Sequence, residues 1–574
     1  MERSTGTDLH GRHRFSGHRY RTRRSGIEQL DGDAAPDHRW PVRDRDPLGD
    51  RAGDVVPTVQ EASLPRADPP RPRGARVAAA GDRQRTGRAD RHDPPLDPHC
   101  GVRSGRSRSV LQGVRAQRRS RVSAGRYLLY GIGVTNSAVA RALARRGAEA
   151  VLVDDTASDR LDDLAAELDV AVHVAPDEGQ LAALLSGVEA VVPAPVLGDL
   201  HRVIAAATAA GVPICSEFDL AGAWDDRPLL AVTGTNGKTT VALLAAAMLA
   251  HSGIANRAVG NLEVPLVEAI DDPEPEWFVV EASSFRLAHT RRFRPEVAVW
   301  LNLAPDHLDL HADLESYRTA KERIFADQGT GDTAVIVLDD PVVASATIPE
   351  GVRIVGIDST PASMRHVDAL ATVIDGRLVV RSAEGLLTDL IAVEDLPRRL
   401  PHDITNSLAA AAAALAAGAS PAGVTAALGS TAPPPHRVEF VAEVDGVEFI
   451  DDSKSTAPHS TLAALAGFDS VVLIAGGRNK GLDLSILGDS SERVRAVIGI
   501  GESASAVIAA FPDRPGETAG SMDDAVRLAA AHARPGDTVL LSPGCASFDW
   551  YSSYVERGED FAAAVRQHAG AVRP

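Results

Sequence analysis

The chain contains very little lysine. Only four of its 60 basic residues are lysines, Lys238, Lys321, Lys454 and Lys480, and the other 56 are arginines. A sequence that uses arginine wherever a positive charge is enough keeps lysine where its compact charge or its reactive amine is needed. This scarcity argues against treating the lysines as general surface charge. We therefore treat all four as candidate site residues.

Cysteine and long apolar runs are also scarce. The three cysteines, Cys100, Cys215 and Cys545, are widely spaced and show neither a disulfide framework nor zinc-ligand spacing. No apolar run approaches the ~20 residues that cross a bilayer, and no signal peptide is visible. We predict a cytoplasmic protein without a membrane span. A chain of 574 residues is too long for one core and indicates three or four domains.

Residues 1–125 differ from the rest in composition. They carry 26 arginines, no lysine and 16 acidic residues, whereas acidic residues exceed basic ones in the remainder. Runs such as RPRGAR and RADRHDPP have no hydrophobic period and cannot bury enough apolar surface to offset the entropy of ordering. We predict a dispensable, disordered, arginine-rich extension, for which an over-extended translation start is the preferred explanation. Interleaved acids and sparse aromatics argue against nucleic-acid binding.

The segment LLAVTGTNGKTT, residues 229–240, joins an apolar strand to a helix through a glycine turn. Its spacing, Gly234-x-x-Gly237-Lys238-Thr239, is two residues shorter than the common phosphate loop. Such a turn aims backbone N–H groups and the positive end of a helix at a phosphate. The lysine would reach the β- and γ-phosphates, and Thr239 or Thr240 would hold Mg²⁺. The segment therefore predicts a nucleotide-phosphate site.

Order begins near Arg126, where RYLLYGIGVTNSAVARALARRGAEAVLVDD reads as strand, glycine turn, helix and strand. This is a Rossmann-like pattern. Asn136 stands where the third glycine of a dinucleotide fingerprint belongs, which argues against a dehydrogenase and leaves another nucleotide open. Further strands are expected at residues 170–174, 190–192 and 211–216.

Polar residues follow the next strands. WFVVEASSF ends in Glu281 and Ser283, and VAVWLNLAPDHLDLH ends in Asp306 and His307. Because α/β sheets bind ligands at the carboxyl ends of their strands, these groups and Thr239 could together hold Mg²⁺. Lys321 follows on a helix, SYRTAKERIF. Asn406 is expected to open an alanine-rich helix.

The recurring strand, loop and helix order predicts an α/β fold of three doubly wound units. The first and last are Rossmann-like and the middle one is a P-loop ATPase unit, all after the disordered arm. The last unit contains four strand-like runs, VEFIDDSKST, SVVLIAGGRNKG, AVIGIGESA and DTVLLSPGCASFD. The proposed boundaries are 126–216, 217–433 and 434–574.

These motifs, in this order, resemble the Mur ligase family, the ATP-dependent amide-forming enzymes of peptidoglycan precursor synthesis. The resemblance covers about residues 126–574. TGTNGKTT is shared with folylpolyglutamate synthetases, whereas the segments 281–285, 451–454 and 542–549 are similar to the branch that adds D-glutamate. The resemblance implies a monomeric ligase that joins D-glutamate to UDP-N-acetylmuramoyl-L-alanine through an acyl phosphate, with ATP and Mg²⁺.

The resemblance also assigns roles to residues. The implied ATP site comprises Gly234, Thr235, Asn236, Gly237, Lys238, Thr239, Thr240, Asn406, Arg437 and Asp452. The implied site for the UDP-linked substrate comprises Gly133, Val134, Thr135, Asp154, Asp155, Thr156, Asn261 and Ser283. The implied D-glutamate site comprises Lys454, Thr456, Lys480, Ser547, Phe548 and Tyr554. The implied metal ligands are Thr239, Glu281, His307 and a carbamylated Lys321, and the implied catalytic residues are Lys238, His307 and Lys321.

The chain departs from the family pattern at several positions. Asp403 and Asp451 stand where the family often has asparagine, and Ala457 and Arg286 replace an expected Asn and Gln. Additional carboxylates near ATP are expected to weaken its binding unless they face magnesium or solvent.

Three alternatives remain open. The chain is another Mur-type ligase, a folylpolyglutamate synthetase, or a non-catalytic nucleotide-binding regulator. A regulator would be expected to have lost Lys321 or Lys480, and both are present. For Lys321 itself the simpler interpretation is a solvated cation on an exposed amphipathic helix.

Overall fold

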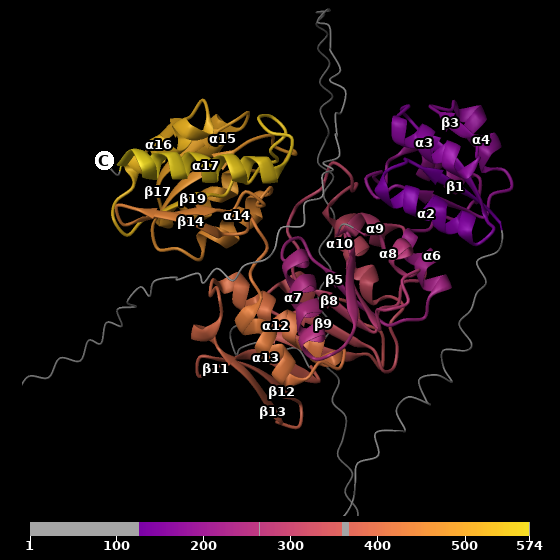
Figure 1. The fold of residues 1–574 in the computed structure, drawn as a ribbon, viewed down its shortest axis with the longest axis horizontal. Coiled ribbons are helices and arrows are strands. Elements are labelled where there is room, and N and C mark those ends of the chain that lie inside the picture. Colours follow the sequence, from indigo (N-terminus) through magenta and orange to yellow (C-terminus); the bar gives the residue numbers. More distant parts are fainter. Residues whose placement is uncertain (1–124, 263, 359–366, 573–574) are drawn as a thin grey trace, which may run out of the picture. The chain divides into compact units, whose positions relative to one another are not determined.

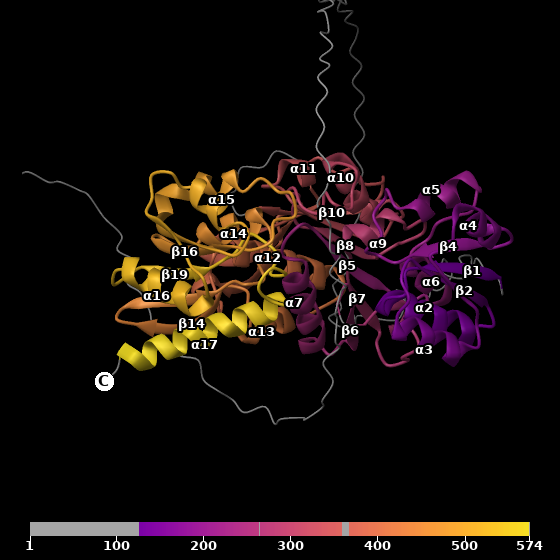
Figure 2. The same cartoon turned by 90° about the horizontal axis from the view of Figure 1, so that it is seen from above.

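The computed structural model describes residues 125–262, 264–358 and 367–572. The predicted disordered arm, residues 1–125, lies outside the described residues except for Gly125. Three sheets organise the described chain (Figures 1 and 2). A search of the described helices finds none that is both long and apolar enough to span a bilayer.

The first sheet has four parallel strands in the order β3-β2-β1-β4. Its strands are β1 Arg126–Tyr130, β2 Glu149–Asp154, β3 Val172–Val174 and β4 Ala190–Pro193. Its helices are α2 Val134–Arg145, α3 Asp159–Leu168, α4 Glu178–Leu185 and α5 Arg202–Ala209. Side chains alternate along β1, since Leu128 and Tyr130 pack in one core and Tyr127 and Leu129 in another. The sheet is therefore buried on both faces.

The middle sheet has nine strands in the order β13-β12-β11-β10-β9-β8-β5-β7-β6. They are β5 Leu229–Thr233, β6 Asn256–Gly260, β7 Trp277–Glu281, β8 Val297–Trp300, β9 Thr333–Val337, β10 Arg353–Asp358, β11 Ala369–Ile374, β12 Arg377–Ser382 and β13 Leu387–Ala392. The pairs from β6 to β11 are parallel, and β12 and β13 extend the sheet as antiparallel strands.

Helices cover both faces of the middle sheet. They are α6 Glu217–Trp224, α7 Lys238–His251, α8 Leu266–Ala269, α9 Ser284–Ala288, α10 Leu314–Glu322, η1 Arg323–Phe325, α11 Pro341–Ala344, η2 Val393–Asp395, α12 Pro401–Ala416 and α13 Pro421–Ser430. Leu230 and Val232 of β5 pack in the core that includes α7, α12 and α13, whereas Leu229 and Ala231 pack in the opposite core. Figures 1 and 2 show α7, α12 and α13 on one face and α6 and α9 on the other.

The last sheet has six strands in the order β14-β15-β19-β16-β17-β18, and only β14 is antiparallel. They are β14 Glu439–Val444, β15 Val447–Asp451, β16 Val471–Gly476, β17 Val494–Ile500, β18 Gly516–Thr518 and β19 Thr538–Leu541. The helices are α14 Pro458–Leu465, η3 Ser485–Arg493, α15 Ala504–Ala509, α16 Met522–His532 and α17 Tyr554–Val572. This sheet also separates two apolar cores.

The predicted fold class, three α/β units, is confirmed. The domain boundaries remain predictions, and the three sheets lie within them. Two local predictions are wrong. Residues 211–216 form only a bridge between Ile214 and Val191. Asn406 lies inside α12, which begins at Pro401 because proline suits the first turn of a helix.

Strand β14 was missed by the sequence analysis. It pairs with β15 through a two-residue turn at Asp445 and Gly446, both of which have positive φ. An Asp-Gly pair between two apolar runs is a strong hairpin signal. This strand was therefore predictable from its turn.

Candidate active site

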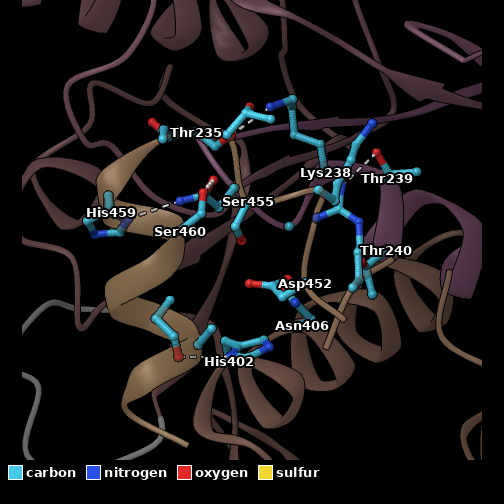
Figure 3. Close-up of a pocket in the computed structure, with 18 of the residues that line it drawn as sticks. Thr235, Lys238, Thr239, Thr240, His402, Asn406, Asp452, Ser455, His459 and Ser460 are labelled. Carbon is cyan, nitrogen blue, oxygen red and sulfur yellow. Dashed lines mark hydrogen bonds between the residues drawn. The ribbon is translucent and has the colours of Figure 1, made fainter. Parts of the chain in front are cut away.

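A polar cavity of about 580 Å³ lies where strand β5 ends (Figure 3). The residues lining it come from the phosphate loop, from the ends of β7 and β8, from α12, and from the last α/β unit. Sixteen of the candidate site residues named from the sequence are among them: Thr235, Asn236, Gly237, Lys238, Thr239, Thr240, Asn261, Glu281, Asp306, His307, Asn406, Arg437, Asp452, Lys454, Thr456 and Tyr554. Residues far apart in sequence therefore meet at one site.

The phosphate loop ends β5 and begins α7 with Gly237 as the N-cap, at a left-handed φ of 86°. A Cβ atom there would lie 2.6 Å from Asn406 Oδ1, so the position requires glycine. Lys238 Nζ donates hydrogen bonds to the carbonyl oxygens of Gly234 at 2.9 Å and Thr235 at 2.8 Å. Burial lowers the pKa of Lys238, and the charges of Glu281 and Asp306 oppose that effect.

Glu281 lies at the end of β7 and is buried. Its Oε1 accepts a hydrogen bond from Asn261 Nδ2 at 3.1 Å. Its Oε2 is buried and has no hydrogen-bond partner within the part of the chain that the structure describes. A buried carboxylate oxygen without a partner is costly unless a cation binds it. This orphaned oxygen beside the phosphate loop fits a divalent cation.

Asp306 and His307 follow β8 on the same side of the sheet. His307 has a left-handed φ of 56°, a conformation that is uncommon for non-glycine residues. Its Nε2 lies 3.4 Å from Asp306 Oδ2. Burial lowers the pKa of His307 to about 4, partly opposed by the charge of Asp306. The imidazole is therefore neutral at pH 7 and can act as a metal ligand.

Lys321 lies behind the phosphate loop and does not line the cavity. Its side chain is 1% exposed, and Nζ donates a hydrogen bond to Gly234 O at 2.7 Å. Nζ also lies 4.4 Å from the ring centroid of Tyr317. Burial, and secondarily the charge of Lys238, hold the pKa of Lys321 well below its usual value. The interpretation of Lys321 as a solvated cation is therefore wrong.

The phosphate loop also contacts helix α14 of the last unit. Asn236 Nδ2 lies 3.0 Å from His459 Nδ1, and Ser460 Oγ donates to Asn236 Oδ1 at 2.6 Å. His459 and Ser460 are labelled in Figure 3. Arg437 Nη2 donates to Thr239 Oγ1 at 3.4 Å. We name the three-residue contact of Asn236, His459 and Ser460 the loop–α14 contact. It joins the proposed phosphate site directly to the last unit.

The two aspartates that depart from the family pattern both have partners within the protein. Asp403 forms a two-pronged ion pair with Arg398, at 2.6 Å from Nε and 2.5 Å from Nη2. Asp451 Oδ2 lies 2.7 Å from His436 Nδ1, and its Oδ1 accepts from Ser453 N at 2.8 Å. Neither carboxylate needs magnesium or solvent, so the expectation that they weaken ATP binding has no structural support.

The cluster of His436, Glu439 and Asp451 brings three ligand-type atoms within 4.8 Å of one another. His436 is already engaged by both partners, since its Nδ1 faces Asp451 and its backbone N–H donates to Glu439 at 2.9 Å. We interpret this cluster as a hydrogen-bonded network.

Asp452 lies at the end of β15 and is 4% exposed. Its Oδ2 accepts from Ser542 Oγ at 2.7 Å and its Oδ1 from Val438 N at 3.3 Å. Burial raises the pKa of Asp452 to about 6.

Only some of the residues predicted to bind the amino-acid substrate line the cavity. Lys454, Thr456 and Tyr554 line the cavity, with Lys454 Nζ 3.7 Å from the Tyr554 ring centroid. Lys480 lies beside this set, with its Nζ 3.9 Å from Asp306 Oδ1. Ser547 is buried outside the cavity lining, and Phe548 is 62% exposed.

Six of the eight residues predicted for the UDP-linked substrate lie at the strand ends of the first sheet, outside this cavity: Gly133, Val134, Thr135, Asp154, Asp155 and Thr156. Asn261 lines the cavity, and Ser283 precedes α9 of the middle unit. Gly133 is the N-cap of α2 and has no side chain to cap the helix. Asp154 accepts from Ile132 N at 2.7 Å and Thr156 N at 3.1 Å, so it supports the glycine turn. Asp155 accepts from Tyr130, His201 and Arg202. Ser283 caps α9, and Val134 is exposed.

Asn136, which replaces the third glycine of a dinucleotide fingerprint, is fully buried. Its Nδ2 donates to the carbonyl oxygens of Tyr130, Gly131 and Val192. The asparagine therefore ties the turn to two strands, and that role explains why the fingerprint is incomplete.

The sequence analysis missed His459, Ser460, Asn302 and Arg398. His459 and Ser460 lie five and six residues after the segment 451–454 that was singled out, so their position was a usable signal. Asn302 lies two residues after the end of β8, and its Oδ1 accepts a hydrogen bond from Asn236 N of the phosphate loop at 2.8 Å. The Arg398–Asp403 pair is local in sequence and was also within reach.

A mostly parallel α/β sheet whose glycine-lysine loop faces a polar cavity is the arrangement of P-loop nucleotide-binding proteins. Matches to protein-family models narrow this class further. Residues 232–414 match the Mur ligase middle domain, and residues 436–545 match the Mur ligase glutamate ligase domain.

Three relatives carry the name UDP-N-acetylmuramoylalanine–D-glutamate ligase. The protein of Frankia casuarinae is 44% identical over 452 residues, 77% of this chain and 94% of its own length. Those of Streptomyces coelicolor and Thermobifida fusca are each 36% identical, over 76% and 78% of this chain and 97% and 99% of their own lengths. The chain belongs to the Mur ligase family, whose members are ATP-dependent ligases. The resemblance read from the motifs is thereby confirmed.

Proposed function

We propose that the protein uses ATP to add D-glutamate to UDP-N-acetylmuramoyl-L-alanine, a step of peptidoglycan precursor synthesis. The names of its relatives support this reaction. The structural observation that carries it is the shared cavity, which Lys238 lines from the phosphate loop and Lys454 and Tyr554 line from the last unit. Such a cavity brings a triphosphate and an amine acceptor together.

The chemistry needs an activated carboxylate, because a free carboxylate is a poor electrophile. An oxygen of the alanine carboxylate attacks the γ-phosphorus of ATP, the bond to the ADP oxygen breaks, and an acyl phosphate forms. The D-glutamate amine then attacks the acyl carbon, loses a proton and displaces inorganic phosphate. Lys238 would offset the negative charge that crowds between carboxylate and phosphate.

Mg²⁺ is the proposed metal. Glu281, His307 and Thr239 would hold it, and the partnerless Glu281 oxygen supports this assignment. When bound, Mg²⁺ supplies positive charge to the phosphate oxygens. Lys321 would contribute an oxygen ligand only after carbamylation, since an amine offers none. Its buried, low-pKa amine is suited to that reaction with CO₂.

The proposed D-glutamate site uses cations for the two carboxylates of the amino acid. Lys454 and Thr456 line the cavity, and Lys480 lies near Asp306 at its edge. A neutral side chain would leave these groups unpaired, at a cost of about 1–3 kcal/mol or more.

The test is a ligation assay that offers UDP-N-acetylmuramoyl-L-alanine, ATP and Mg²⁺ with a panel of amino acids. D-Glutamate should be by far the best acceptor, with one ADP released for each product formed. Preference for meso-diaminopimelate or L-alanine would favour another Mur-type ligase, and a folate acceptor would favour a folylpolyglutamate synthetase. ATP binding without ligation of any acceptor would favour a regulator.

We also propose a cytoplasmic location. A monomer is the proposed oligomeric state. Light scattering of the purified protein would test it.

A further inference from the structure

Arg286 is a buried cation that the proposed chemistry does not use. It lies on the short helix α9, directly after the strand end that carries Glu281, and is 6% exposed. Its guanidinium carbon lies 5.7 Å from the Phe218 ring centroid. A charged side chain is rarely buried to this degree unless its partners are fixed.

One partner of Arg286 is structural. Its Nη1 forms an ion pair with Glu217, the first residue of α6, which is also buried. Glu217 Oε2 accepts a hydrogen bond from Val267 N at 2.9 Å, so the carboxylate is anchored from α8 as well. Burial raises the pKa of Glu217, and the charge of Arg286 opposes that rise. This pair alone would explain only how α6, α8 and α9 pack.

The second partner lies in the first α/β unit. Arg286 Nη2 donates a hydrogen bond to Thr135 Oγ1 at 3.0 Å. Thr135 is the second residue of α2, and the N-cap residue Gly133 provides no side-chain cap. The contact therefore connects the middle sheet with the helix N-terminus proposed to face the diphosphate of the UDP-linked substrate.

The direction of this hydrogen bond determines what the Thr135 hydroxyl can do. A guanidinium has only donors, whereas a threonine hydroxyl has one proton and two acceptor lone pairs. Thr135 Oγ1 must accept from Arg286, so its single proton is available to another acceptor. Among residues 125–572 that the structure describes, no acceptor takes this proton. Arg286 Nε is likewise buried with no partner in the described chain.

We propose that Arg286 is a positioning residue for the UDP-linked substrate, which it serves by orienting the Thr135 hydroxyl toward the substrate diphosphate. The inference rests on the proposed function. Diphosphate oxygens accept hydrogen bonds and carry negative charge, so they match a hydroxyl whose acceptor side is held by a cation. The N-terminus of α2 adds backbone N–H groups at the same place. Arg286 acts through Thr135 and need not touch the substrate.

The first test measures binding of UDP-N-acetylmuramoyl-L-alanine and of UDP alone by isothermal titration calorimetry. Arg286→Lys keeps the charge opposite Glu217 but cannot reach two partners, and Thr135→Val removes the hydroxyl while keeping the shape. Each variant should weaken binding of both ligands about tenfold, the scale of one charge-assisted hydrogen bond. The double variant should bind no more weakly than either single variant, because both changes remove the same interaction.

The kinetic readout separates positioning from general damage. In Arg286→Lys, KM for the UDP-linked substrate should rise about tenfold while kcat and KM for ATP change less than about twofold. Thr135→Ser keeps the hydroxyl and should retain near-normal binding. Arg294→Gln is a matched control, because Arg294 forms a half-buried ion pair with Asp332 at 2.5 Å in the middle unit. It should leave binding of both ligands unchanged.

The outcomes distinguish this inference from the proposed function. If the wild-type protein binds neither UDP nor the UDP-linked substrate, the proposed function fails. If the wild-type protein binds both and Arg286→Lys binds them equally well, the positioning role is wrong. Additive losses in the double variant, or parallel losses in kcat and in every KM, would assign Arg286 to packing only.

Discussion

Lys321 and Lys238 donate hydrogen bonds to the same backbone oxygen, the carbonyl of Gly234, at 2.7 and 2.9 Å. Two ammonium groups that share one acceptor repel each other, and burial adds the cost of removing charge from water. Both effects favour loss of a proton from the more deeply buried Lys321. The Gly234 carbonyl thus holds two amines side by side: that of Lys238, the cation proposed to bind phosphate, and that of Lys321, whose basicity is unusually low.

We expect that arginine cannot replace lysine in the proposed D-glutamate site. Lys454 Nζ packs over the Tyr554 ring, and Lys480 Nζ approaches Asp306. Arginine keeps the charge but is wider and planar, so Lys454→Arg and Lys480→Arg should each lower kcat/KM for D-glutamate by about tenfold or more. Steady-state kinetics with varied D-glutamate measure this effect. Arg478→Lys, in an exposed ion pair with Glu502, should be neutral. Near-normal kcat/KM in both lysine variants would contradict the idea that scarce lysines mark sites.

Sequence reasoning located groups that lie at strand ends, because the position of a strand end can be read from local pattern. Glu281, Asp306 and His307 follow apolar runs directly, and parallel strands bring such ends to one edge of the sheet. The phosphate loop could be predicted equally well, because it needs the backbone freedom of Gly237 and the compact charge of Lys238. Together they supplied nine of the residues that line the cavity.

Contacts between residues far apart in the sequence could not be predicted in this way. Lys321 meets Gly234 across 87 positions of sequence, on a helix segment of mainly polar residues that reads as solvent-exposed. Asn236 meets His459 across 223 positions. Neither periodicity nor composition specifies which distant segments pack together. The ion pair of Asp403 with Arg398 was not predicted, although the two residues are close in sequence.

The loop–α14 contact should matter for ATP use. Ser460→Ala removes the 2.6 Å hydrogen bond to Asn236 Oδ1 and leaves only His459 to hold the Asn236 side chain from α14. We expect KM for ATP to rise and kcat to fall by roughly three- to tenfold, the scale of one hydrogen bond. Steady-state kinetics with varied ATP measure both parameters.

A double-mutant cycle sharpens this prediction. Adding Asn236→Ala to Ser460→Ala should cost less than the sum of the single losses, since the two residues share one contact. Ser505→Ala, at an exposed position of α15, is the control and should be neutral. Fully additive losses would indicate that Ser460 acts independently of the loop.

Asp452 should make the stability of the ligand-free protein depend on pH. Burial raises the pKa of Asp452 to about 6 from an unfolded value of 3.8. Between these values the folded state binds more protons than the unfolded state, so stability falls as pH rises through this window. The loss would approach roughly 3 kcal/mol above pH 6.

Asp452→Asn removes this titration, although it changes the hydrogen bonds from Ser542 and Val438 at every pH. The difference in melting temperature, variant minus wild type, should therefore become more positive from pH 4 to pH 6 and then level off. Thermal unfolding in a pH series without ATP measures it. The exposed Asp489→Asn variant should follow the wild type throughout. A difference that is flat with pH would mean that Asp452 is not desolvated as the fold indicates.

Whether Lys321 is carbamylated distinguishes a lysine that takes part in the chemistry from one that serves only the fold. Reaction with CO₂ needs an uncharged amine, and the resulting anion needs a cation to stabilise it. The buried Lys321 meets the first condition, and the partnerless Glu281 oxygen marks a place where a cation would sit. Arginine cannot form the carbamate, so Lys321→Arg should be almost inactive even though its charge is kept.

Lys321→Ala should also be nearly inactive, but a small carboxylate should restore part of its activity. Acetate could occupy the space of the missing side chain and supply the oxygens that the carbamate would have offered to Mg²⁺. Recovery of kcat should therefore saturate with acetate concentration in the ligation assay. Lys238→Ala lacks a cation and not an anion, so acetate should not restore it. Near-normal activity of Lys321→Arg would remove carbamylation from the mechanism, because a guanidinium at this buried position can neither lose its proton nor bind a metal.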